Sequence, residues 1–221
     1  SAFRSAGQRC SALRLLCVHE SIADGVIEMI QGAAAELRVG DTADLSTDLG
    51  RVIDSEACQN IEKHLKRLNS EAKPLLAVVF VANHATNNIA NMVSPSAFEL
   101  ASIADIGAEI FGPVLHVVRW RGDPAVVIDQ INALGYGLTL GIQTRIDSRA
   151  QALARAAHVG NVYVNRNQIG AVVGVQPFGG EGLSGTGPKA GGPHYLYRFC
   201  AEQTLTVNST AAGGNAALLA G

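Results

Sequence analysis

The stretch VLHVVRWRGDPAVVIDQINALGYGLTLGIQTRIDSRAQALARAAHVGNVYVN, residues 114–165, decides the fold class of this chain. Three short runs of β-branched and apolar residues within it, 114–120, 138–143 and 161–165, predict strands. Two helices are predicted between the strands, one capped by Asp123-Pro124 and running through 134, the other opened by Asp147 and running through 158. Apolar strands that alternate with helices predict an α/β fold with a mostly parallel, open sheet and helices on both faces.

Further elements are predicted on either side of this stretch. Apolar residues recur every three or four positions over 21–37, with Glu20 or Ser21 as the cap, and over 55–68, with Asp54 as the cap; both patterns indicate amphipathic helices. Cys58 falls on the apolar face of the second helix and is interpreted as core. Residues 76–81 and 203–208 are predicted strands. The glycine-rich segment 170–192 carries apolar side chains that a linker lacks, so it is interpreted as an ordered loop.

Composition excludes several classes of protein. The chain has 221 residues, of which 48% are hydrophobic and 16% charged, with a formal net charge of -2. Such a chain can bury a full core, and it lacks the basic patch of a nucleic-acid-binding protein. Its longest apolar run, 75–82, is too short to cross a bilayer, and the first eight residues do not resemble a signal peptide. A cytoplasmic protein is therefore expected, and the low charged fraction suggests surfaces that another chain or domain covers.

The four cysteines, Cys10, Cys17, Cys58 and Cys200, are irregularly spaced and form no CxxC pair, so neither a zinc site nor a disulfide framework is indicated. Cys10 follows a glycine closely and adjoins an arginine, and positive charge nearby favours a thiolate. It is therefore the candidate nucleophile. No histidine lies in a recognisable partner motif, and spacing alone leaves a purely structural cysteine open.

Three motifs point to a known family. AGQRC at 6–10, EIFGPV at 109–114 and QPFGG at 176–180 occur in the order and spacing of the aldehyde dehydrogenase superfamily. The longer stretches 161–178 and 182–193 resemble one branch of it, the L-glutamate 5-semialdehyde (1-pyrroline-5-carboxylate) dehydrogenase part of the bifunctional proline-utilisation proteins of bacteria. The resemblance covers residues 1 to about 219. Chance is an improbable source of three separate matches.

The resemblance implies a thiol mechanism and assigns roles to residues. Cys10 would attack the aldehyde, and its backbone N–H would help to hold the oxyanion. Glu109 would bind the nicotinamide ribose hydroxyls of NAD, and Phe111 would pack beside that ribose. A carboxylate suits a diol because it accepts two hydrogen bonds. The site residues implied for the substrate are Ser11, Gly170, Ala171 and Phe178.

Ser11 and the loop at Gly170 and Ala171 would hold the α-carboxylate of the substrate, because small residues let backbone N–H groups approach an anion. Phe178 would pack along the aliphatic part of the substrate. A simple turn made by Gly170 and Ala171 and a core role for Phe178 are the alternatives. The GxGxxG at 180–185 is not a dinucleotide fingerprint, because further glycines and prolines follow it instead of a helix.

The resemblance further implies a domain organisation. Residues 1–200 would be the aldehyde dehydrogenase catalytic domain, and 201–221 a tail that pairs subunits of a homodimer. The NAD-binding half, with the carboxylate that activates the deacylating water, would lie upstream in a longer, bifunctional parent, where FAD would serve only a proline dehydrogenase domain. The fragment alone would then be inactive apart from slow acylation of Cys10. The parent would be cytoplasmic, with contact to the inner membrane only through its other parts.

Two other interpretations stay open. In the first, the chain would belong to an aldehyde dehydrogenase that acts on a different aldehyde; Ser11 and the 170–171 loop argue against this. Comparing glutamate semialdehyde with succinate semialdehyde as substrates would separate the two interpretations. Alternatively, it is a non-catalytic assembly module that docks through its C-terminal strand. Loss of dimerisation without chemistry at Cys10 would favour that module.

Overall fold

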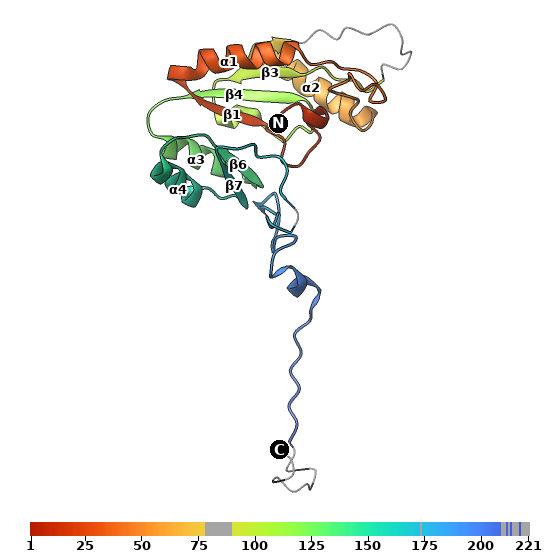
Figure 1. The fold of residues 1–221 in the computed structure, drawn as a ribbon, viewed down its shortest axis with the longest axis vertical. Helices are drawn as coiled ribbons and strands as arrows, with labels where there is room; N and C mark the ends of the chain where they lie inside the picture. Colours follow the sequence, from red (N-terminus) through yellow and green to blue (C-terminus); the bar gives the residue numbers. More distant parts are fainter. Residues whose placement is uncertain (78–89, 173, 209–210, 212, 214–216, 218–221) are drawn as a thin grey trace.

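The computed structural model describes residues 1–77, 90–172, 174–208, 211, 213 and 217. Its larger part is a four-stranded sheet in the order β1-β4-β3-β2 (Figure 1). The strands are β1 Leu15–His19, β2 Lys73–Ala77, β3 Ser96–Leu100 and β4 Val114–Trp120. β1 and β3 each pair with β4 in parallel, and β2 pairs antiparallel with β3. Two helices accompany this sheet, α1 Glu20–Ala35 and α2 Ser55–Glu71.

The side chains of β4 divide between two cores. Leu115 and Val117 belong to the core under α1, together with Val18, Ala23 and Ile27. The alternate β4 residues Val114 and Val118 belong to the core that holds Cys58, Ile61 and Leu68 of α2. Because successive strand residues point to opposite faces, this division places the two helices on opposite faces of the sheet. The α/β prediction with helices on both faces is confirmed, as is the core position of Cys58.

The smaller part of the fold follows β4. It contains α3 Pro124–Ala133, α4 Asp147–Ala156 and the parallel pair formed by β6 Thr139–Ile142 and β7 Asn161–Val164 (Figure 1). The short strands β5 Tyr136–Gly137 and β8 Glu181–Gly182 pair antiparallel. Three 3-10 turns complete the described elements: η1 Arg4–Gly7, η2 Ile103–Ile106 and η3 Tyr195–Phe199. The predicted sheet is thus divided into one mixed sheet and two short pairs.

The helix caps illustrate how far local chemistry decides the elements. The side chain of Asp54 accepts a hydrogen bond from the Ala57 N–H at 2.8 Å, and Asp123 accepts one from Ala125 N–H at 2.9 Å, as predicted. At α1 the prediction of Glu20 or Ser21 as the cap is wrong. His19 precedes the helix, and its Nδ1 accepts from the Ser21 N–H at 3.3 Å.

Other differences concern strands. β1 and β3 are five-residue strands that the sequence pattern did not single out, because their pairing with β4 rather than local composition makes them strands. The predicted strand 76–81 overlaps β2 only at its start, and 78–81 lie outside the described residues.

The predicted strand 203–208 is wrong, because this segment extends away from the sheets and pairs with none of them (Figure 1). Leu205 and Val207 are 83% and 72% exposed, so its apolar alternation packs against neither core. Among the described residues, no helix has the length and apolarity that a bilayer crossing requires.

Candidate active site

The segment that leads to Cys10 is a tight left-handed turn. Ser5, Ala6 and Gly7 have φ values of 57°, 52° and 67°. A Cβ atom at Gly7 would collide with the carbonyl group of Gly112, so only glycine permits this approach. The AGQRC and EIFGPV motifs are therefore in direct backbone contact.

Gln8 fixes the same turn from its other side. Its Nε2 donates to the carbonyl of Arg51 at 3.2 Å, and its Oε1 accepts from the N–H of Ile53 at 2.8 Å. Both ends of the amide are used, which orients the side chain uniquely. The glutamine of the motif thus anchors the turn before Cys10 to residues 51–53.

Cys10 is exposed and lines a cavity of about 680 Å³. The cavity wall is formed by β1, β6, α3 and the segment 106–111. Glu109 and Phe111 line the same cavity. The structure therefore brings together the predicted nucleophile and both residues predicted to contact the cofactor.

The other thiols are poorer candidates for a nucleophile. Cys17 also reaches the cavity, but burial raises its pKa to about 12, which keeps the thiol protonated at neutral pH. Burial, followed by the charge of the Glu62 carboxylate, raises the pKa of Cys58. Cys200 is exposed but lies just after η3, outside this cavity. Among the four thiols, Cys10 alone is both exposed and on the cavity wall.

Arg14 connects the nucleophile segment with the segment of Glu109. Its Nη2 donates to the carbonyl of Arg9 at 3.3 Å, and its Nη1 donates to the carbonyl of Gly112 at 3.1 Å. Its Nε lies 3.5 Å from Oε1 of Glu109, forming an ion pair. The guanidinium carbon is 4.6 Å from the centroid of the Phe111 ring. One side chain thus contacts both motifs.

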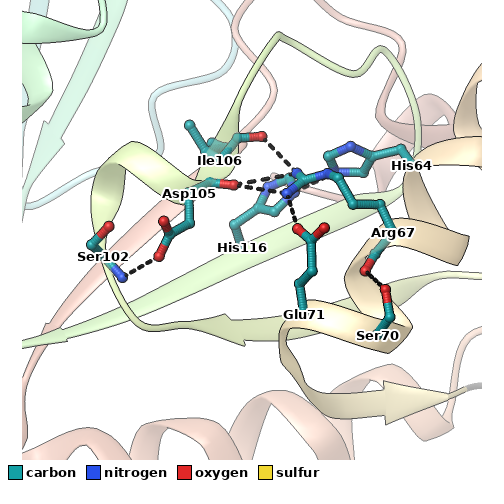
Figure 2. Close-up of polar contacts among 8 residues, drawn as sticks. All are labelled: His64, Arg67, Ser70, Glu71, Ser102, Asp105, Ile106 and His116. Carbon is teal, nitrogen blue, oxygen red and sulfur yellow. Dashed lines mark hydrogen bonds and ion pairs between the residues drawn. The ribbon is translucent and has the colours of Figure 1, made fainter.

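A buried histidine pair contacts the backbone of Arg14. The Nε2 atoms of His64 on α2 and His116 on β4 are 2.8 Å apart (Figure 2). His116 Nδ1 lies 2.8 Å from the carbonyl oxygen of Arg14. Burial lowers the pKa of His64 to about 4, with further lowering by His116 and by the charge of Arg67. Burial also lowers the pKa of His116, although its hydrogen bond to Arg14 opposes this. Both rings are therefore neutral at pH 7.

The segment before Glu109 is held to α2. Figure 2 shows Arg67 reaching across to the carbonyls of Asp105 and Ile106 and to the side chain of Glu71. The guanidinium donates to each carbonyl at 3.2 Å, and its Nη1 pairs with Glu71 at 2.9 Å. Asp105 in turn accepts from the Ser102 N–H and completes a capping box at η2. These contacts fix the chain three residues before Glu109.

The residues predicted to bind substrate do not line the cavity that Cys10, Glu109 and Phe111 share. Ser11 is buried, and its carbonyl accepts a hydrogen bond at 3.3 Å from Nε2 of Gln168, a cavity-lining residue that sequence reasoning missed. Gly170 is exposed with φ of 83°, and Ala171 is half-buried. Phe178 is half-buried and forms a backbone bridge with Ala190. Ser11, Gly170, Ala171 and Phe178 lie outside the lining of the Cys10 cavity.

Asn161 organises the loop that contains Phe178. Its Nδ2 donates to the carbonyl of Pro177 at 3.0 Å, and its Oδ1 accepts from the N–H of Gly179 at 3.3 Å. Lys189 adds a hydrogen bond from Nζ to the carbonyl of Gly160. Asn161 begins β7 and is itself buried, so it fixes the loop to a regular element.

Sequence reasoning missed Arg14, His116 and Asn161. Arg14 lies four residues after the candidate nucleophile, and His116 interrupts the apolar run 114–118. A lone polar residue in an apolar run signals a buried hydrogen-bonding partner, which is the signal that could have found His116. Among the residues that the structure describes, no group of three or more His, Cys, Asp or Glu side chains could hold a metal ion.

Comparison with known proteins relates this geometry to one family. The profile of the aldehyde dehydrogenase family matches residues 1–205. The chain is 55% identical over 206 residues to the bifunctional protein PutA of Escherichia coli K12, covering 92% of this chain and 16% of the relative. It is 33% identical over 213 residues to a 1-pyrroline-5-carboxylate dehydrogenase of a Geobacillus strain, covering 93% of this chain and 39% of that protein.

Solved structures similar to this chain come from the same two kinds of protein. A crystal structure of a Bradyrhizobium japonicum PutA variant has a TM-score of 0.87 at 55% identity, over 96% of this chain and 21% of that one. A Thermus 1-pyrroline-5-carboxylate dehydrogenase with bound NAD has a TM-score of 0.80 at 35% identity, over 90% of this chain and 38% of that one. The chain thus spans about a sixth of the PutA relative and well under half of the dehydrogenase. On its matched residues and its fold, this chain belongs to the aldehyde dehydrogenase family.

Proposed function

We propose that this chain carries the thiol centre of an enzyme that oxidises L-glutamate 5-semialdehyde to L-glutamate with NAD, the second step of proline catabolism. The observation that carries the proposal is the meeting of Cys10, Glu109 and Phe111 on one cavity. Membership in the aldehyde dehydrogenase family supports it. So does the identity with PutA and with 1-pyrroline-5-carboxylate dehydrogenases.

Cys10 performs the covalent chemistry in this proposal. Its thiolate adds to the aldehyde carbon, a C–S bond forms and the carbonyl oxygen becomes an oxyanion. Oxidation at that carbon gives a thioester, which water cleaves to release the carboxylate and the thiol. The net reaction consumes aldehyde, NAD and water and yields carboxylate, NADH and two protons. Arg14 donates a hydrogen bond to the carbonyl of Arg9, the residue before Cys10, and would place a cation near the developing negative charge.

The residues of the cavity fit the nicotinamide riboside end of NAD. The Glu109 side chain is 35% exposed and Phe111 is 44% exposed, so a carboxylate and an aromatic face are both open to a ligand. Glu109 would accept hydrogen bonds from the ribose diol, and Phe111 would pack beside the sugar. NAD, when bound, supplies a hydride acceptor. A Thermus 1-pyrroline-5-carboxylate dehydrogenase with bound NAD is among the structural relatives.

The proposal extends to the residues that bind substrate. We assign the α-carboxylate of the aldehyde to Ser11, Gly170 and Ala171, and its aliphatic part to Phe178. The hydrogen bond between Gln168 and the Ser11 carbonyl supports a link between the nucleophile segment and the 170–171 loop. The left-handed φ of 83° at Gly170 is the kind of backbone that presents N–H groups to an anion.

The whole enzyme requires more than these 221 residues in this proposal. The PutA relative is about six times as long as the segment matched here, and we place the rest of the NAD site and any FAD-dependent proline dehydrogenase in that remainder. The enzyme is proposed to be cytoplasmic and homodimeric, with residues 201–221 pairing subunits. The exposed Leu205 and Val207 favour such pairing, and they also keep the assembly-module interpretation open.

A substrate comparison tests the proposal. We would measure NADH formation by the full-length gene product with L-glutamate 5-semialdehyde and with succinate semialdehyde, over a range of each. A kcat/KM at least about tenfold higher for the glutamate aldehyde is expected, because the site is proposed to recognise an α-amino acid group. Equal or reversed preference contradicts the assignment of the substrate. The 221-residue chain alone is expected to form no NADH.

A further inference from the structure

The Arg14 side chain bridges the nucleophile segment and the segment of Glu109, in addition to the backbone contact between Gly7 and Gly112. Its guanidinium spans the carbonyl of Arg9, the carbonyl of Gly112 and the carboxylate of Glu109. We propose that Arg14 is a positioning residue that fixes the cofactor-binding carboxylate Glu109 relative to Cys10. This inference rests on the proposed function of those two residues.

The geometry uses the whole guanidinium group. Nε, Nη1 and Nη2 each serve a different acceptor, at 3.5, 3.1 and 3.3 Å, and the plane lies over the ring of Phe111. A planar fork with five N–H donors can serve several acceptors at once, whereas the ammonium of lysine is a compact point charge. The shape of the side chain, and not its charge alone, therefore links the two motifs.

The backbone of Arg14 is also fixed. Its carbonyl oxygen accepts from the backbone N–H of His116 at 3.0 Å and lies 2.8 Å from His116 Nδ1. A carbonyl can only accept, so Nδ1 of His116 carries the proton and its Nε2 accepts from Nε2–H of His64. Figure 2 shows these two rings meeting between α2 and β4. Arg14 thus extends from a backbone held by His116, which is itself held by His64.

The surroundings of Arg14 suit a fixed cation. The side chain is only 13% exposed, and burial lowers its pKa, while the charge of Glu109, its hydrogen bond, and the charge of Cys10 act in the opposite direction. An arginine stays protonated under such conditions. A buried charge that lost its partners would be costly, so the three acceptors and Arg14 hold one another in place.

The test compares Arg14→Lys and Arg14→Gln with the wild type in the full-length gene product. Three quantities are measured: the dissociation constant of NAD by calorimetry, the separate KM values of NAD and aldehyde, and acylation of Cys10 by p-nitrophenyl acetate without NAD. Arg119→Lys is the matched control. Arg119 also joins two carboxylates, those of Glu99 and Asp24, but it does not line the cavity of Cys10.

We expect both Arg14 variants to weaken NAD binding by about tenfold or more, since hydrogen bonds to charged groups typically have that effect. The KM of the aldehyde should change less than about threefold, and Arg119→Lys should leave both constants unchanged. In a cycle with Glu109→Gln, the effects on NAD binding should be strongly non-additive, because Arg14 acts through Glu109.

Several results would overturn the inference. Wild-type NAD affinity in Arg14→Lys would mean that charge alone suffices, and a lower melting temperature with unchanged NAD affinity would mean a merely structural role. If neither Arg14 variant folds, Glu109→Gln decides: it should slow acylation of Cys10 without NAD, and an unchanged rate contradicts the coupling. Failure of the proposed function gives a different result, a wild type that forms no NADH from the aldehyde.

Discussion

The segments on either side of residue 165 differ in how they are held. Before it, the Cys10 and Glu109 segments are fixed by buried cores and by side chains such as Gln8 and Arg14, which bond to backbone carbonyls. After it, none of the described residues is buried, and apolar side chains such as Phe199, Leu205 and Val207 are open to solvent. The proposed covalent and cofactor chemistry thus lies on the rigid part, and the proposed substrate loop and subunit contact lie on the part with fewer internal restraints.

This difference suggests a division of labour. A nucleophile and a cofactor carboxylate require fixed relative positions, which a packed sheet provides. A loop that recognises substrate, and a tail that pairs subunits, can gain order from the partner they bind. Substitutions can therefore either remove restraints from the first part or test whether the second part has any.

The largest expected effect follows from breaking the contact between the two motifs. Gly7→Ala would place a Cβ against the carbonyl of Gly112 at a φ of 67°. Left-handed strain and overpacking together should lower the free energy of unfolding by about 3 kcal/mol, as measured by urea denaturation.

Gly32→Ala is the matched control for that change. Gly32 lies in α1, and a Cβ added there would meet no atom within 4 Å, so alanine should stabilise the helix by about 0.5–1 kcal/mol. Equal effects of the two substitutions would show that the Gly7 contact does not restrain the site.

The buried histidine pair should make the rigid part sensitive to acid. Because burial lowers the pKa of folded His64 to about 4, below the ordinary value of 6.5, the unfolded chain takes up a proton first as the pH falls. Stability from this ring is present above about pH 6.5 and is lost toward pH 4. We expect a loss of about 2 kcal/mol between pH 7 and pH 5, measured by denaturation at each pH.

His64→Gln separates this ring from other titrating groups. Glutamine can still donate to Nε2 of His116 but does not titrate, so the variant should show a flatter pH dependence. An unchanged pH dependence in the variant would argue that His64 is not the titrating group.

A smaller effect is expected where the loop is tied to β7. Asn161→Ala removes the hydrogen bonds to Pro177 and Gly179, which are both half-buried, and should lower the free energy of unfolding by about 1 kcal/mol. If the loop binds substrate, the KM of the aldehyde should rise while NAD affinity is unchanged. Asn161→Asp retains the acceptor toward Gly179 and should have the smaller effect. A change in NAD affinity without a change in the KM of the aldehyde would contradict a role of the loop in substrate binding.

The smallest effect on stability is expected in the tail. Leu205→Asp with Val207→Asp should change the free energy of unfolding of the monomer by less than about 0.5 kcal/mol, because both side chains are exposed. If the tail pairs subunits, the same double variant should convert dimer to monomer in light scattering. A dimer that survives would remove the tail from the proposed interface.

The sequence predicted those parts of the molecule that depend on local chemistry. Capping by Asp54 and Asp123 and the apolar strand at 114–120 follow from residue type and period, and the structure agrees. β1 and β3 depend on pairing with β4, which no local pattern reveals. The strand at 203–208 failed for the same reason, because alternation without a neighbouring strand forms no ladder.

The candidate site shows the same limit. The motifs identified Cys10, Glu109 and Phe111, which lie together, because a resemblance carries three-dimensional information that spacing does not. Arg14, His64 and His116 act through contacts between residues distant in the chain, so their roles needed coordinates. Phe178 and the 170–171 loop lie outside the lining of the Cys10 cavity, so the motifs did not reveal which residues share that cavity.

The most direct test of the account is NADH formation from L-glutamate 5-semialdehyde by the full-length gene product, compared with its Cys10→Ala variant. Circular dichroism should first establish that both proteins are folded. The account predicts NADH formation by the wild type and none above background by the variant, because no other described thiol is both exposed and on the cavity wall. NADH formation that survives in Cys10→Ala would contradict the thiol mechanism.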